Sequence, residues 1–139
     1  MTGERLFLDT AFIQALLNSR DDYHNRAKNL FSRVTAASEV WLTEAILVEV
    51  GNALSKFNRR GAAQFIQQCY RTDNIRVVSI TTELFVQALA LYQSRSDKTW
   101  GLTDCISFVV MRTNNLLDAV TADRHFTQAG FRALMLEMK

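Results

Sequence analysis

Short apolar runs alternate with helical patterns along the chain, and this alternation constrains the fold more than any other feature of the sequence. The runs resemble buried strands and lie at residues 5–9, 39–43, 75–80 and 116–121. Helical patterns separate them, at about 10–17, 21–34, 44–57, 61–70, 81–92 and 103–113, with a short helix near Asp123 and a last apolar run at 133–138. Strands that alternate with helices predict an α/β fold, in which a parallel β-sheet is sandwiched by helices as three α/β/α layers.

The length and composition predict one domain, residues 1–139. Hydrophobic residues make up 48% of the chain and there is no proline, which argues against disorder and against Pro-rich linkers. No apolar run is long enough to span a membrane, and the first nine residues lack the apolar stretch of a signal peptide. Cys69 and Cys105 lack the spacing of a zinc site and are expected to be buried thiols of a reducing compartment. We therefore expect a cytoplasmic protein without a membrane segment.

Two acids follow predicted strands. In open parallel sheets, ligands bind beyond the carboxyl ends of the strands. Asp9 ends the first strand and Asp123 follows the strand that contains Thr121, so both acids are predicted to lie at this edge. The ordinary structural alternative is that each carboxylate caps the helix that follows it.

Two further acids lie on predicted helices. At 100° per residue, Glu49 borders the apolar face of the helix at 44–57, whereas Glu44 points to the opposite side. Glu49 is therefore expected to face the interior or a cleft, although a snorkelling edge glutamate, or one salt-bridged to an arginine, remains an alternative. Asp104 opens an apolar helix, where it either joins the site or only complements the helix dipole, and Ser107 follows one turn later on the same face.

Together these acids predict a cation site. Four carboxylates can share one cleft only if a positive charge compensates them, and the segments around Asp9 and Asp104 carry few basic residues. Mg²⁺, or alternatively Mn²⁺, prefers such oxygen ligands. If the four acids face inward, the rest of the chain has 16 basic residues against 10 acidic ones, a surface suited to an anionic polymer.

Four segments resemble PIN-domain ribonucleases, and among them the VapC-like toxins of toxin–antitoxin modules. They are FLDT at 7–10, TEAILVEV at 43–50, LTDCISF at 102–108 and TADRHF at 121–126. The resemblance spans essentially the whole chain. It implies an Mg²⁺-dependent endoribonuclease, a cognate antitoxin that blocks the site, and a homodimer.

The resemblance also implies residue roles. Asp9 and Asp104 correspond to direct metal ligands, and Glu49 and Asp123 to outer acids that hold water. Thr10, Ser107 and Thr121 match hydroxyl positions beside such sites. The expected reaction is attack on an RNA phosphate by water that the cation activates.

Several residues have ordinary explanations. His24 and His125 are assigned to the surface or to packing, and Trp100 either stacks on a base or anchors a loop. The basic residues are scattered, but Lys98, Arg112 and Arg124 flank the acidic segments and are candidate RNA contacts. Two other classes remain open: an Mg²⁺-binding receiver-like or phosphotransfer domain, disfavoured because no lysine follows the late strand, and a non-catalytic binding module.

Overall fold

The computed structural model describes residues 3–137, which form one parallel five-stranded sheet. The order of the strands across the sheet is β3-β2-β1-β4-β5, and every neighbouring pair is parallel. Their bounds are β1 Arg5–Leu8, β2 Glu39–Thr43, β3 Ile75–Val78, β4 Asp118–Val120 and β5 Arg132–Ala133.

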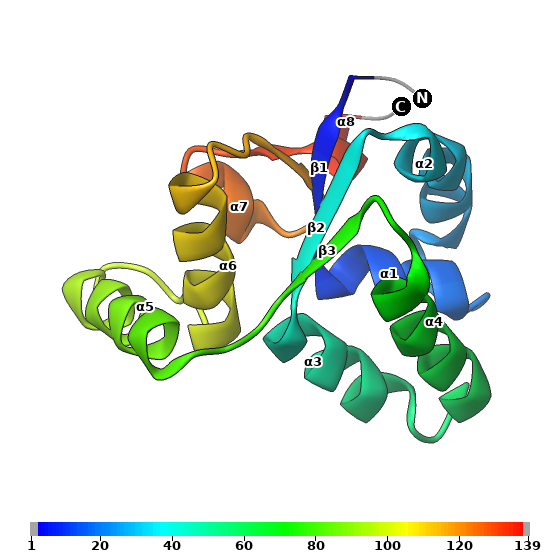
Figure 1. Cartoon of the computed structure of the whole chain (residues 1–139), viewed down its shortest axis with the longest axis horizontal. Helices are drawn as coiled ribbons and strands as arrows, with labels where there is room; N and C mark the ends of the chain where they lie inside the picture. Colours follow the sequence, from blue (N-terminus) through cyan, green and yellow to red (C-terminus); the bar gives the residue numbers. More distant parts are fainter. Residues whose placement is uncertain (1–2, 138–139) are drawn as a thin grey trace.

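Helices cover both faces of this sheet. Figure 1 shows α1, α2 and α4 on one side of the strands and α5, α6 and α7 on the other, while α3 lies beyond the end of β2. The predicted α/β/α sandwich is therefore confirmed. The helix bounds are α1 Thr10–Leu17, α2 His24–Ala36, α3 Glu44–Leu54, α4 Arg59–Arg71, α5 Thr82–Ser94, α6 Leu102–Thr113, α7 Arg124–Gln128 and α8 Leu134–Glu137. None of the helices in residues 3–137 is both long and apolar enough to span a bilayer.

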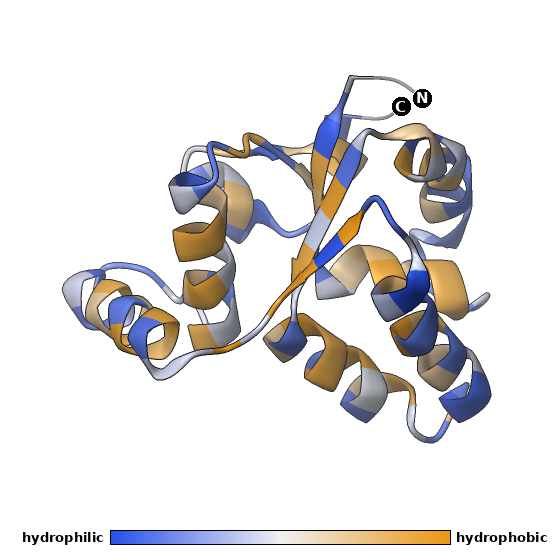
Figure 2. Cartoon of the chain, in the orientation of Figure 1, coloured by the Kyte–Doolittle hydropathy of each residue, from blue (hydrophilic) through white to orange (hydrophobic). Residues whose placement is uncertain are grey.

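The central strands are buried on both faces, as parallel strands covered by two helical layers must be. Leu6 and Phe7 of β1 are fully buried. The ring of Phe126 lies 6.4 Å from Phe7 and 5.0 Å from Phe108 between ring centroids, which joins α7 and α6 to the sheet. In Figure 2 the strands are largely apolar and the outer helix faces carry most of the hydrophilic residues.

The direction of winding reverses between β1 and β4. The chain first adds β2 and β3 on one side of β1, and then adds β4 and β5 on the other side. The register pairs Leu8 with Val120, so the next residues, Asp9 and Thr121, follow adjacent strands at the carboxyl edge. Such a switch point leaves a crevice between the diverging connections, where doubly wound folds bind ligands.

Several element ends differ from the predictions. The second helix begins at His24 with Tyr23 in the capping position, because Asp21 accepts a hydrogen bond from the Tyr23 amide within the preceding turn. The third helix ends at Leu54 rather than at 57, and the strand predicted at 75–80 ends at Val78. The last apolar run contains β5 residue Ala133 and then α8, and its end at Met138 lies outside the described residues.

Candidate metal-dependent active site

Asp9 lies at the switch point and its side chain does not cap α1. Asp9 occupies the capping position, but its side chain forms no capping hydrogen bond with α1, so helix capping does not explain its carboxylate. Its Oδ2 instead accepts a hydrogen bond of 2.7 Å from the Thr121 hydroxyl. Only 6% of Asp9 is exposed, and burial, followed by the nearby charges of Asp104 and Asp123, raises its pKa to about 7.

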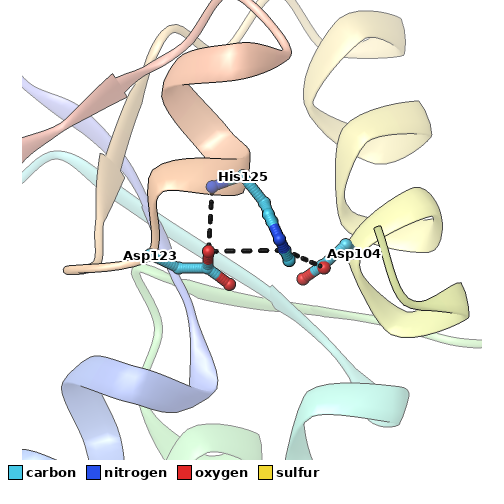
Figure 3. Close-up of side chains that lie close together, drawn as sticks. All are labelled: Asp104, Asp123 and His125. Atoms are coloured by element: carbon cyan, nitrogen blue, oxygen red, sulfur yellow. Dashed lines mark hydrogen bonds and ion pairs between the residues drawn. The ribbon is translucent and has the colours of Figure 1, made fainter. Parts of the chain in front are cut away.

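Asp104 and Asp123 converge on one imidazole (Figure 3). Nδ1 of His125 lies 2.9 Å from Oδ2 of Asp104 and 3.4 Å from Oδ1 of Asp123. Asp104 comes from the first turn of α6 and also accepts a bond from the Gly101 amide, whereas Asp123 caps α7 by accepting from the His125 amide. Each carboxylate therefore both caps the N-terminus of a helix and lies in the cluster, so a capping role does not exclude a functional one.

Glu49 is connected to the end of β1 through a hydroxyl. The Thr10 hydroxyl donates to Oε1 of Glu49 at 2.7 Å, and Thr10 directly follows Asp9. Glu44 instead accepts a bond of 2.7 Å from the Tyr70 hydroxyl on α4. Among these two acids of α3, it is thus Glu49 that lies beside the Asp9 segment, as the helical wheel predicts.

The predicted hydroxyl residues differ in their contacts. Thr121 contacts two parts of the site, since its oxygen also accepts a bond of 3.0 Å from the Asp123 amide. Ser107 is fully buried, and its hydroxyl is the one buried side-chain polar atom among the described residues without a hydrogen-bond partner. Native proteins rarely leave such a group unpaired without a reason.

The candidate RNA contacts separate into two groups. Arg124 is exposed beside Asp123, and Lys98 belongs to the loop before α6, so both flank the acidic cluster. Arg112 does not: it lies in the last turn of α6, where its guanidinium donates to the Ala129 carbonyl and covers the Phe131 ring. Eight residues of helix separate it from Asp104, about 12 Å along the axis, which places Arg112 away from the cleft.

Trp100 is a loop anchor and is not positioned to stack on a base. Only 4% of it is exposed, its indole N–H donates to Gln128, and its ring packs edge-on against Phe108. The stacking alternative for Trp100 is therefore wrong.

His125 is the site residue that the sequence interpretation missed. The sequence assigns it to the surface or to packing, yet its ring lies between the two carboxylates. The available signal was its position two residues after Asp123, at the start of a helix at the ligand edge.

The donor set suits a divalent cation. One ligand atom each from Asp104, Asp123 and His125 lie within 4.8 Å of one another. Burial raises the pKa of Asp104, and the negative charge of Asp123 raises it further. The charges of Asp104 and Asp123 raise the pKa of Asp9 in the same way. A cation would remove this repulsion and fix the acids in their ionised form, so the residues fit a metal.

Comparisons with known proteins agree with this architecture. The PIN domain family profile matches residues 6–132. The 23S rRNA-specific endonuclease VapC20, from two Mycobacterium tuberculosis strains (CDC 1551 / Oshkosh and ATCC 25618 / H37Rv), is 29% identical over 126 residues, which cover 91% of this chain and 95% of the relative.

Solved structures have the same fold. The crystal structure of Mycobacterium tuberculosis VapC20, described as a Sarcin-Ricin loop cleaving toxin, matches with a TM-score of 0.82 and 27% identity over 91% of this chain and 96% of that one. VapBC2 from Rickettsia felis, bound to a promoter DNA fragment, matches with a TM-score of 0.62 over 91% and 94% of the two chains. FitAcB from Neisseria gonorrhoeae matches with a TM-score of 0.60 over 92% of this chain and 95% of that one. The last two share 13% identity and so speak for the fold alone. From the profile match, the order of the strands and the acids at the switch point, we conclude that the chain belongs to the PIN domain family.

Proposed function

We propose that this chain is an Mg²⁺-dependent endoribonuclease, with Mn²⁺ as a substitute, and that it is the toxin of a toxin–antitoxin pair. The observation that carries the proposal is the buried carboxylate of Asp9 at the switch point, hydrogen-bonded to Thr121 and repelled by Asp104 and Asp123. Similarity to an endonuclease named for 23S rRNA makes 23S rRNA the first substrate to test.

Asp9 and Asp104 would hold the cation. Asp123 and His125 each offer a ligand atom within 4.8 Å of one on Asp104, whereas Asp9 lies outside that group and interacts with Asp104 and Asp123 through their charges. A bound divalent cation would make water a stronger nucleophile and stabilise negative charge on the phosphate oxygens. The chain's own groups orient the acids: Thr121 fixes Asp9, the Gly101 amide fixes Asp104, and the α7 amide of His125 fixes Asp123.

Glu49 and Asp123 would act as outer acids that position water in line with the scissile phosphate. Thr10 sets the position of one Glu49 oxygen, so the other oxygen remains for water. The buried, unpartnered Ser107 hydroxyl, one turn after Asp104, supports a further water contact there. Lys98 and Arg124 would meet RNA phosphates around this edge, a role that the position of Arg112 does not support.

An antitoxin is the proposed protein partner. A cavity of ≈ 610 Å³ between α1, α2 and α4 is lined by apolar side chains that include Phe12, Leu16, Phe31 and Phe65. Phe31 is 45% exposed there. Such a groove suits the apolar face of an amphipathic helix. If a small protein is encoded beside this gene, co-expression with it should give a complex that Phe31→Glu disrupts, while a complex unaffected by that change would place the antitoxin elsewhere.

A homodimer is the proposed assembly, in the cytoplasm, with residues 1–139 acting as one domain. Helix α5 buries only Ala88 among its described side chains and exposes Phe85, Val86 and Leu89 on its outer surface. An apolar patch of this kind marks a contact surface. Sedimentation velocity should show a dimer that Val86→Glu converts to a monomer; a monomeric wild-type chain would contradict this assembly.

The decisive experiment is cleavage of total RNA with Mg²⁺, with Mn²⁺ and with EDTA, followed by mapping of the fragment ends. We expect discrete cuts that EDTA abolishes and that Asp9→Asn removes. Asp73→Asn is the matched control. Asp73 is exposed in the loop before β3, where the strands begin, and so lies at the edge of the sheet opposite to the acids. EDTA-insensitive cleavage by a folded Asp9→Asn protein would refute the proposal. Binding without cleavage would favour the non-catalytic module, and phosphorylation of Asp9 would favour the receiver-like domain.

A further inference from the structure

A second cavity adjoins the acidic cluster. It lies between the end of α5 and the loop that leads into α6, and measures ≈ 380 Å³. Its lining includes Tyr92, Arg95, Lys98, Thr99 and Trp100. No role proposed above uses this cavity as a whole, although Lys98 is already proposed as an RNA contact.

One wall of the cavity contacts the acidic cluster directly. The Thr99 hydroxyl oxygen lies 3.3 Å from Nε2 of His125, and the other ring nitrogen of His125 lies 2.9 Å from Asp104. A molecule seated against Thr99 is therefore separated from the acids by the width of a single imidazole ring. This distance suits a nucleotide adjacent to the phosphate that is cleaved.

Several contacts hold the loop that lines the cavity. The indole N–H of Trp100 donates to Gln128 at 2.9 Å, and the Arg95 guanidinium carbon lies 4.8 Å from the centre of the Trp100 ring. Arg95 also forms a two-pronged ion pair with Asp97, at 3.0 and 3.1 Å. These contacts hold the loop in place before any ligand arrives, which lowers the entropy lost on binding.

The exposed groups of the cavity suit a single-stranded nucleotide. Tyr92 is 48% exposed and presents an aromatic ring at the rim, whereas Trp100 is covered. Two cations, Arg95 and Lys98, share the one carboxylate of Asp97, so the local charge is positive. An aromatic ring beside uncompensated positive charge is the combination with which proteins bind unpaired bases and their phosphates.

We propose that this cavity binds one unpaired nucleotide of the RNA substrate, with the base on the Tyr92 ring and a phosphate at Lys98. The proposal rests on the endoribonuclease function above and assigns its substrate a single-stranded segment next to the cut. A base paired within a helix cannot enter, because its faces are covered by its stacked neighbours.

The test measures binding separately from cleavage. Fluorescence anisotropy of the Asp9→Asn protein, with a labelled RNA oligonucleotide as a single strand and as a duplex, gives the dissociation constants without turnover. Tyr92→Ala should weaken single-strand binding by about 5-fold or more, and Tyr92→Phe should restore it. Lys98→Ala should weaken binding and reduce the slope of log K against log salt by about 1. Tyr70→Ala and Lys28→Ala, at exposed positions on α4 and α2, are the matched controls and should change nothing.

Each outcome decides between the two proposals. Unchanged affinity in Tyr92→Ala, or equal affinity for single strand and duplex, would overturn the nucleotide site even if wild-type protein cleaves RNA. Absence of cleavage by wild-type protein, with Tyr92-dependent binding retained, would overturn the nuclease proposal and leave the binding site standing.

Discussion

The Thr121 hydroxyl donates to Oδ2 of Asp9 at 2.7 Å, which joins the ends of the adjacent strands β1 and β4 by a buried hydrogen bond. The same oxygen accepts the Asp123 amide proton, so one side chain positions both the Asp9 carboxylate and the chain that carries Asp123. Thr121 is fully buried, and its contacts cannot be replaced by bulk solvent.

Replacement of Thr121 by valine should impair both stability and activity. Valine keeps the shape but leaves the Asp9 oxygen and the Asp123 amide without partners, which costs about 1–3 kcal/mol of unfolding free energy. RNA cleavage should fall at least tenfold because Asp9 loses its orientation. Thr121→Ser, which keeps the hydroxyl, is the control in urea unfolding and cleavage assays; equal cleavage by the valine and serine variants would contradict a positioning role.

The stability of the metal-free protein should fall as the pH rises from about 4 to about 7. The pKa of Asp9 is raised from 3.8 to about 7 in the folded state, so over this interval the folded protein binds more protons than the unfolded chain. The free energy of unfolding then decreases with pH by up to about 4 kcal/mol, and the loss is complete above about pH 7. Asp104, whose pKa is also raised, acts in the same direction.

Asp9→Asn isolates the Asp9 contribution because asparagine is close in shape and does not ionise. Its unfolding free energy should vary less across this interval and should exceed that of wild type at pH 8 in EDTA. Urea denaturation at pH 5, 6, 7 and 8 measures both curves. Parallel curves would show that Asp9 ionises normally in the folded protein.

A divalent cation should reverse this loss. Binding to the folded state raises apparent stability by RT ln(1 + [L]/Kd), and Asp9 must lose its proton before it can act as a ligand. With a pKa of about 7, the apparent affinity for Mn²⁺ should be about tenfold weaker at pH 6 than at pH 8. Thermal unfolding with Mn²⁺ at the two pH values checks this, and Asp9→Asn should show a much smaller shift. An equal shift in both proteins would place the cation away from Asp9.

Much of the fold was predictable because its determinants are local. Buried parallel strands are short continuous apolar runs, and the residues at 5–8 and 39–43 are of that kind, so their elements were found within a residue or so. The two-residue strand at Arg132–Ala133 was not predicted, since its pairing with β4 defines it and its own composition does not. Helix ends were off by several residues where turn hydrogen bonds, such as that of Asp21, decided the boundary.

The site was predictable where strand ends define it and not where side chains meet across elements. The positions of Asp9, Thr121 and Asp123 follow from the rule that the carboxyl ends of parallel strands lie at the same edge of the sheet, where ligands bind. The contact between His125 and Asp104 spans 21 residues and depends on how α7 packs on α6, which no sequence spacing encodes. The prediction that Arg112 lies near the acids fails for a similar reason. Arg112 is close to Asp104 in the sequence, but both lie on α6, and the helix between them sets them about 12 Å apart along its axis.

Glu49→Gln and Glu44→Gln provide the last test, since both acids lie on α3 and only one lies beside Asp9. Glutamine at 49 can still accept the Thr10 hydrogen bond but has lost its charge, so RNA cleavage should fall by one to two orders of magnitude while the melting temperature changes little. Glutamine at 44 keeps an acceptor for the Tyr70 hydroxyl, and cleavage should stay within about twofold of wild type. Initial rates at saturating Mg²⁺ measure both variants. If Glu44→Gln is the impaired protein, the outer acid of the second segment is Glu44, and Glu49 serves only to hold Thr10.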